Sequence, residues 1–243
     1  DFNFSRNRSK IVKLLDREND DIGNGWFIGE QLEVYYDRVF DGIWQLDEAD
    51  EAETFGREVG QVKLADLNDD GTINDDDRKI VGFVDPQWIG GITNTIRFKE
   101  WDFSVVGLTR QGHTIRARAI FANNSLVGRN NNVNINYWTP ENPSNEFPRP
   151  DADRQGPRDE GAVNYFDGSY FRVRNITLGY SFNESVLSAI KVENLRLYMT
   201  AQNPLLFRVD DRLIPGVDPD VSGSGSEWLP SPRTFLWGLS LTF

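Results

Sequence analysis

The chain contains no cysteine and a single histidine, His113. Disulfide bonds, thiolate catalysis and cysteine-based zinc or iron–sulfur sites are therefore excluded. A metal site built from several histidines is impossible, and a Ser-His-Asp triad would have to use His113. Because its neighbours are Gln111, Gly112 and Thr114, we expect an ordinary solvated or hydrogen-bonded histidine. The sequence predicts a protein that is not an enzyme.

The chain also lacks long hydrophobic runs, since none approaches the roughly 18 residues that a transmembrane helix needs. Hydrophobic residues make up only 38% of the sequence, whereas aromatic residues reach 12%. This combination argues against one thick aliphatic core and favours many short strands that are apolar on one face. Basic residues are too few to balance the acids, and the formal net charge of −12 disfavours nucleic acid as a partner.

Apolar and polar residues alternate with a period of two in segments of about ten residues, the weak signature of transmembrane β-strands. The last segment shows the pattern most clearly, because one side of it is apolar throughout and the other is mostly small or polar. The apolar side consists of Phe235, Trp237, Leu239, Leu241 and Phe243. Aromatic residues also stand near the expected strand ends, where a membrane barrel has its interfacial girdles. These are Phe98, Trp101, Phe182 and Phe243.

We expect strands at residues 1–13, 31–45, 87–98, 101–114, 169–182, 194–207 and 233–243. The alternation slips inside 169–182, and a bulge near Arg174-Asn175 would explain the slip. Lys99-Glu100 is expected to form a tight turn, and residues 183–193 are enough for one helical turn. The connections 46–86, 115–168 and 208–232 are long, polar and rich in Gly, Pro, Asn and Asp.

Short connections thus alternate with long ones, as in bacterial outer-membrane barrels with short periplasmic turns and long extracellular loops. The sequence predicts an all-β fold, in which residues 1–243 form the C-terminal segment of a large antiparallel transmembrane barrel. Such barrels usually have an even number of strands, so seven strands indicate that part of the barrel precedes this chain. The opening residues, Asp1 to Phe4, also resemble the middle of a strand.

Residues 66–77, inside the expected loop 46–86, match a calcium loop of the EF-hand type. Oxygen donors stand at positions 1, 3, 5 and 12, and a glycine at position 6 allows the sharp turn. The predicted ligands are Asp66, Asn68, Asp70, the Thr72 carbonyl and Asp77. Position 12 is Asp where Glu is usual, and no amphipathic helix precedes the loop. We therefore expect a structural calcium site, the alternative being an Asp/Asn-rich turn without metal.

Aromatic residues in the polar connections are candidates for contact with a substrate or a partner. The predicted contact residues are Trp44, Tyr137, Trp138 and Trp228. Such rings can stack on sugars or line an interface, and anchoring of the loops is the alternative role.

Several motifs occur in a fixed order along nearly the whole chain. They are YDRVFDGIWQ (36–45), GQVK (60–63) leading into DLNDDGTINDDDRKIVG, GGITNT (90–95), NYWTPENP (136–143), DGSYFRVRNITLGYSF (167–182), AQNP (201–204) and the terminal PRTFLWGLSLTF. In combination they resemble the C-terminal third of SusC/RagA-like TonB-linked outer-membrane transporters from Bacteroidetes-type bacteria. Asn203-Pro204 stands where this family often has Asn-Leu, and residues 208–232 contain few of the aromatics often found there.

The resemblance implies a barrel of about 22 strands in the cell outer membrane, in contact with lipid and plugged by an N-terminal domain that this sequence does not include. It also implies contact with TonB through the plug, a SusD-like surface lipoprotein as partner, and import of oligosaccharides or peptides. Two alternatives stay open. One is a secreted β-sandwich that binds or cleaves glycan with the help of calcium, and the other is a siderophore receptor barrel.

Overall fold

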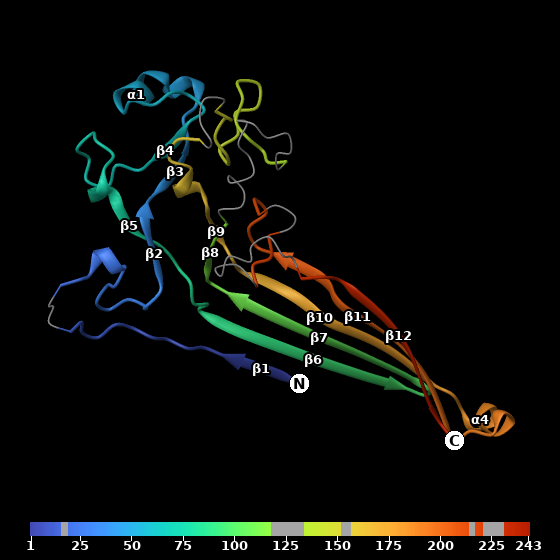
Figure 1. Ribbon diagram of the computed structural model, residues 1–243. Helices are drawn as coiled ribbons and strands as arrows, with labels where there is room; N and C mark the ends of the chain where they lie inside the picture. Colours follow the sequence, from blue (N-terminus) through green and yellow to red (C-terminus); the bar gives the residue numbers. More distant parts are fainter. Residues whose placement is uncertain (16–18, 118–133, 152–156, 214–216, 221–230) are drawn as a thin grey trace.

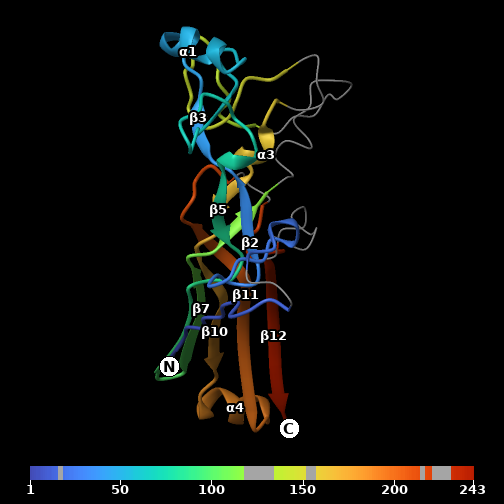
Figure 2. The same ribbon diagram turned by 90° about the vertical axis from the view of Figure 1, so that its left-hand side faces the viewer.

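The computed structural model describes residues 1–15, 19–117, 134–151, 157–213, 217–220 and 231–243. Five long strands and one short strand form one sheet, here called the wall sheet, and a more compact part lies at one end of it (Figures 1 and 2). The compact part, here called the loop unit, consists of the described residues of the connections 6–87, 112–169 and 209–233. Among the described residues, no helix has the length and apolar character needed to cross a membrane.

The wall sheet has the strand order β1-β6-β7-β10-β11-β12, with antiparallel neighbours throughout. Its strands are β1 (Phe2–Ser5), β6 (Trp88–Phe98), β7 (Trp101–Gln111), β10 (Tyr170–Ser181), β11 (Asn194–Arg208) and β12 (Thr234–Thr242). The five strands after β1 are 9 to 15 residues long, which suits a tilted transmembrane strand of about 9–11 residues. The expected strands from residue 87 onward are therefore confirmed to within a few residues.

The register of the wall sheet separates its side chains into an apolar face and a polar face. Residues directly opposite each other in neighbouring strands share a face. Leu197, for example, pairs with Leu239 and Tyr180, and Met199 pairs with Trp237 and Leu178. On the other face, Thr200 pairs with Thr177, and their hydroxyl oxygens are 3.0 Å apart. The alternation in the sequence thus becomes one mostly apolar surface across the strands.

A bulge in β10 keeps this surface continuous. The pairing of β10 shifts between Val173 and Asn175 against both β7 and β11. Val173 faces Gly107 and Ile176 faces Val105, and both of these β7 residues lie on the apolar face. The extra residue in β10 therefore corrects the phase slip, and the bulge expected near Arg174-Asn175 is confirmed.

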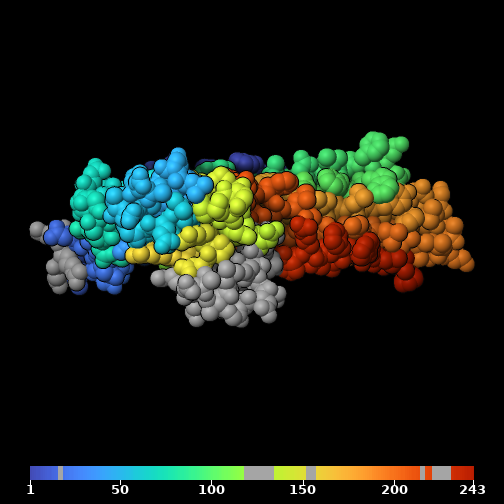
Figure 3. Space-filling model, turned by 90° about the horizontal axis from the view of Figure 1, so that it is seen from above, coloured from blue at the N-terminus to red at the C-terminus, as the bar shows by residue number. Residues whose placement is uncertain are grey.

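Short connections join the strands at one end of the wall sheet (Figure 1), and this end lies opposite the loop unit (Figures 1 and 3). Lys99 adopts a left-handed conformation (φ 53°) in the turn between β6 and β7. Helix α4 (Glu184–Ile190) joins β10 to β11, and the Asn183 side chain caps it by accepting from Val186 N. The rings of Trp101 and Tyr180 lie 4.8 Å apart at this end. The tight turn and the helical turn in 183–193 are both confirmed.

The loop unit contains only short elements. Its helical turns are η1 (Ile22–Asn24), η2 (Leu46–Glu48), α1 (Ala49–Thr54), η3 (Asp75–Asp77) and α3 (Glu160–Val163). Its strands pair as β2 (Val34–Arg38) with β5 (Arg78–Phe83), β3 (Phe40–Ile43) with β4 (Val62–Leu64), and β8 (Thr114–Arg116) with β9 (Tyr165–Asp167). A buried core that draws on all three long connections holds them together, including Ile43, Val62, Trp138, Phe147, Phe166 and Leu213.

The expected strand 31–45 does not belong to the wall sheet. It forms β2, which pairs with β5, and β3, which pairs with β4, both inside the loop unit. Within the described residues the wall sheet therefore has six strands and not seven. Alternation alone could not separate the two cases, because any strand with one buried face shows it. The first strand is also shorter than expected, ending at Ser5. Residues 6–87 are therefore one long connection, and long and short connections alternate without exception.

Candidate functional site

The predicted metal loop, residues 66–77, lies between β4 and β5 in the loop unit. Asp69 and Gly71 adopt left-handed conformations, with φ of 57° and 75°, and these curl the chain around Asp66. The Asp66 carboxylate accepts hydrogen bonds from Asp70 N at 3.3 Å and Gly71 N at 2.7 Å. The Asn68 side chain donates to Asp70 at 2.9 Å. Three of the predicted ligands, Asp66, Asn68 and Asp70, therefore lie together.

Asp77, the predicted position-12 ligand, is fully buried at the base of this loop. Its Oδ1 accepts from Leu67 N at 2.9 Å and its Oδ2 from Asn74 N at 2.8 Å. Among the described residues, no three acidic, histidine or cysteine side chains are arranged to hold a metal ion. The Thr72 carbonyl is 3.5 Å from the Asn74 amide nitrogen. Each Asp77 oxygen thus already accepts one backbone hydrogen bond and keeps a second lone pair.

The predicted aromatic contact residues occupy different environments. Trp44 and Trp138 are 2% and 3% exposed, and Trp138 Nε1 donates to Gln45 Oε1 at 3.0 Å. Both indoles are thus enclosed by the loop unit, in keeping with the alternative role of loop anchoring. Tyr137 is 42% exposed and can meet a ligand or partner. Trp228 lies outside the described residues.

A cluster of arginines and aspartates joins the polar face of the wall sheet to residues 217–220 of the loop unit. Arg172 of β10 donates to Asp218, and both side chains are only 3% exposed. Asp220 accepts from Arg174 and from the Tyr170 hydroxyl. The guanidinium of Arg110 lies 3.8 Å from Asp220. No sequence pattern indicates this cluster beyond the arginines on a polar face, because its partners are 46 residues or more apart in the chain.

Asp218 is the most fully bonded member of this cluster. Besides Arg172, it accepts hydrogen bonds from the backbone nitrogens of Asp220 at 3.0 Å and Ser231 at 3.1 Å. Burial opposes the charged form, but the hydrogen bonds from Ser231, Arg172 and Asp220 outweigh it and hold the pKa of Asp218 below its usual range. The charged carboxylate therefore ties two parts of the last long connection to β10.

His113 lies beside this cluster and is buried, with 4% exposure. Its Nε2 is 3.5 Å from the carbonyl oxygen of Pro219. Burial and then the charge of Arg110 lower the pKa of His113 below its usual value, against the weaker opposing influence of Pro219, Asp167 and Asp220. Of the two environments expected for this histidine, solvated or hydrogen-bonded, the structure shows the hydrogen-bonded one.

On the polar face of the wall sheet, near the short connections, large side chains pack closely over glycines of neighbouring strands. Arg196 of β11 donates to Asp102 of β7 through two nitrogens, at 3.1 and 2.7 Å. The strand between them carries Gly179, where a Cβ would overlap both partners. On β12, Gly238 likewise leaves room for the ring of Tyr198. Glycine at these two positions allows charged and aromatic side chains to cross neighbouring strands.

These features define a membrane β-barrel wall with one lipid-facing surface, one polar lumen surface and a structured cap of loops. The comparisons agree. The chain is 30% identical to TonB-dependent receptor P3 of Formosa agariphila, matching 100% of this chain and 26% of that receptor. It is 32% identical to TonB-dependent receptor SusC of Bacteroides thetaiotaomicron over 74% of this chain and 17% of the receptor. No protein-family profile matches the chain.

The structure of the RagAB peptide transporter matches the fold, with a TM-score of 0.74, 19% identity, and coverage of 100% of this chain and 27% of that one. The chain therefore belongs to the SusC/RagA-like TonB-dependent receptors of the bacterial outer membrane, and it corresponds to a C-terminal part of their barrel. It spans about a quarter of the length of receptor P3. The apolar face of the wall sheet is accordingly the lipid face, and the polar face is the lumen face.

Proposed function

We propose that the complete protein imports oligosaccharides or peptides across the outer membrane, driven by TonB and assisted by a SusD-like surface lipoprotein. The observation that supports this most directly is the match of the entire chain to TonB-dependent receptors, combined with a wall that is apolar on one face and polar on the other. In this proposal the present chain forms part of the barrel wall and of the extracellular mouth. The rest of the barrel and the plug that contacts TonB complete the transporter.

The competing classes are less well supported. A secreted β-sandwich would enclose its apolar residues between two sheets, whereas Trp237 and Leu239 of β12 are 74% and 61% exposed on the wall sheet. A siderophore receptor shares the barrel, and the match to the RagAB peptide transporter favours the nutrient importer over it.

The import function is tested by deleting the whole gene in its native host and measuring growth and uptake on fluorescently tagged oligosaccharides and peptides. We expect loss of uptake of one class, with the same loss when TonB is inactivated. Unchanged uptake of every oligosaccharide and peptide, together with lost uptake of an iron chelate, would favour the siderophore receptor.

The orientation in the membrane follows from the positions of the connections. If the short connections face the periplasm, the loop unit lies outside the cell. A cysteine at Glu53, on the exposed surface of α1, should then react with a membrane-impermeant maleimide on intact cells. The matched control is a cysteine at Glu184 in α4, which should react only after permeabilisation. The reverse labelling pattern would invert this orientation.

We further propose that the loop 66–77 binds calcium, or another hard cation, in a structural role. The left-handed residues Asp69 and Gly71 place Asp66, Asn68 and Asp70 together, which supports the proposal. The two carboxylates of this group, Asp66 and Asp70, repel each other unless a cation lies between them. The loop belongs to a connection that runs from residue 6 to 87, and such a long connection is costly to order.

Calcium removal tests this role. With chelator, protease should cut faster within 66–77, whereas the Asp66→Ala/Asp70→Ala variant should be cut at one fast rate with or without chelator. The barrel should stay folded in every case. Equal cutting of the wild-type protein with and without chelator would argue for the alternative, an Asp/Asn-rich turn held by its own hydrogen bonds.

A further inference from the structure

The lumen face of the wall sheet is basic, although the chain as a whole has a formal net charge of −12. In the six described wall strands, the register places one acidic residue, Asp102, on this face. The basic residues there are Arg97, Arg110, Arg172, Arg196 and Arg208. A low-dielectric wall that carries charge of one sign concentrates molecules of the opposite sign. The lumen face therefore favours anions over cations.

Carboxylates already occupy parts of this face. Asp102 binds Arg196, and Asp218 and Asp220 bind Arg172 and Arg174. Each of these contacts is a charge-assisted hydrogen bond between a guanidinium and a carboxylate, the pairing for which arginine geometry is suited. The arginines of the wall sheet therefore bind carboxylate groups within this chain.

Arg110 lies farther from its carboxylate than Arg172, Arg174 and Arg196 lie from theirs. Its nearest carboxylate, Asp220, is 3.8 Å away, beyond hydrogen-bonding distance. Its Nε is buried and has no hydrogen-bond partner among the described residues. Arg110 also shares a row across the lumen face with Ile89 and Ser5, at the end of the strands next to the loop unit.

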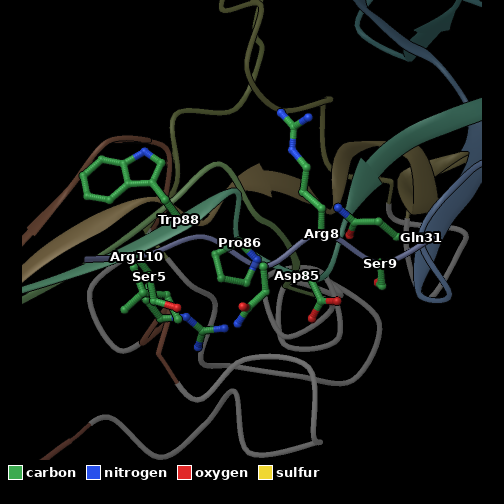
Figure 4. Close-up of a pocket in the computed structure, with 10 residues that line it drawn as sticks. Ser5, Arg8, Ser9, Gln31, Asp85, Pro86, Trp88 and Arg110 are labelled. Carbon is green, nitrogen blue, oxygen red and sulfur yellow. The ribbon is translucent and has the colours of Figure 1, made fainter. Parts of the chain in front are cut away.

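A cavity of about 420 Å³ opens beside Arg110 (Figure 4). Its polar lining includes Ser5, Asn7, Arg8, Gln31, Asp85 and Arg110. Oε1 of Gln31 is buried and, like Arg110 Nε, lacks a partner among the described residues. The indole of Trp88 points away from the other labelled residues and packs against Phe4, with ring centroids 5.7 Å apart. The lining carries two arginines and one aspartate, with Asp220 3.8 Å from Arg110 outside it, while Asp85 and Gln31 offer acceptors for hydroxyl or amide groups.

We propose that this cavity is a binding subsite for a carboxylate group of the cargo, with Arg110 and Arg8 as its cationic ligands. The transported molecule is then an acidic one, such as a uronate-containing oligosaccharide or a peptide with acidic side chains. This inference rests on the proposed import function and narrows its substrate class. Arg110 is the fixed cation because Asp220 lies beside it, and the exposed Arg8 closes onto the ligand.

The complete receptor, purified in detergent, tests the subsite at low ionic strength, where exposed charges are least screened. One arm measures binding of oligogalacturonate and of its neutral methyl ester. The other measures an acidic peptide and the same peptide with its carboxyl groups amidated. We expect tighter binding of the charged member in one arm, and that arm identifies the source of the carboxylate. Losing one charged hydrogen bond corresponds to a reduction of about tenfold or more in affinity.

The variants Arg110→Gln and Arg8→Gln should each remove most of the preference for the charged member, and Arg110→Lys should keep part of it. The matched control is Arg149→Gln, which removes the same charge from an exposed ion pair with Glu58 in the loop unit and should leave the preference intact. Equal binding of charged and neutral ligands by the wild-type receptor, absence of binding in both arms, or an undiminished preference in both Arg110→Gln and Arg8→Gln would overturn the subsite. TonB-dependent uptake of a neutral oligosaccharide or peptide would in each of these cases leave the import function standing.

Discussion

The wall sheet and the loop unit use the same kinds of apolar residue in opposite ways. In the wall sheet, Trp237 is 74% exposed and Leu239 is 61% exposed within this chain. In the loop unit, Phe147 and Phe166 are each 2% exposed and belong to a core drawn from three connections. The wall directs its apolar side chains toward lipid, whereas the loop unit buries them from water. One region of the chain thus exposes its apolar side chains to lipid, and the other buries them from water. The boundary between the two regions runs along the Arg172–Asp218 cluster.

The largest difference between the two regions is expected from a change in the core of the loop unit. Phe147→Ala should destabilise the loop unit by about 3–5 kcal/mol, because it removes a fully buried ring from a water-excluding core. The wall sheet should be unaffected, since its stability depends on lipid and on strand pairing. Protease cutting inside the loop unit, measured beside the heat-induced gel shift of the barrel, separates the two. A parallel loss of both would show that the two regions fold as one cooperative unit.

The boundary itself is tested by removing one partner of its buried ion pair. Arg172→Met leaves the carboxylate of Asp218 buried without its cation, which typically costs about 3–5 kcal/mol. We expect faster proteolysis near residues 217–220 and a lower temperature for the barrel gel shift. The double variant Arg172→Met/Asp218→Asn should recover part of the loss, because no unpaired charge remains. A double variant as unstable as the single one would contradict this account.

The lipid face is tested by placing a charge on it. Leu239→Arg should cost about 2–4 kcal/mol if residue 239 lies near the bilayer midplane. Leu236→Arg is the matched control, because Leu236 of the same strand pairs with Thr200 on the lumen face. The amount of heat-stable barrel in isolated outer membranes should fall for the first variant and change little for the second. Normal assembly of Leu239→Arg would mean that this face does not meet lipid.

The smallest expected effect is a pH dependence at His113. Its pKa is lowered in the folded protein, so between that value and about 6.5 the unfolded chain binds more protons than the folded one. Stability should therefore be complete above about pH 6.5 and should decrease as the pH falls through this window. The decrease is measured as the difference in melting temperature between wild type and His113→Gln, which cancels the titration of other groups. A difference that does not change with pH would contradict a buried neutral histidine.

The sequence was sufficient for the five wall strands after β1 but not for β1 or for the loop unit. Period-two alternation, the turn at Lys99-Glu100 and the slip inside 169–182 depend on neighbours close in the chain, and all three are confirmed. Residues 31–45 show the same alternation yet pair with β4 and β5, and only the tertiary fold decides that. The burial of Trp44 and Trp138, and the meeting of Arg172 with Asp218, also depend on segments far apart in the chain. Local patterns carry no information on such pairings.

The bulge in β10 inverts the usual tolerance of a strand to changes in length. In a regular strand, inserting or deleting two residues preserves the inside and outside positions, and a change of one residue exchanges them. Across Val173 to Ile176, two lipid-facing residues are separated by three positions instead of two. Deleting Arg174 alone would keep Val173 and Ile176 on one side, whereas deleting Arg174 and Asn175 together would send half of the strand to the wrong side. Homologues that differ in length here should differ by an odd number of residues.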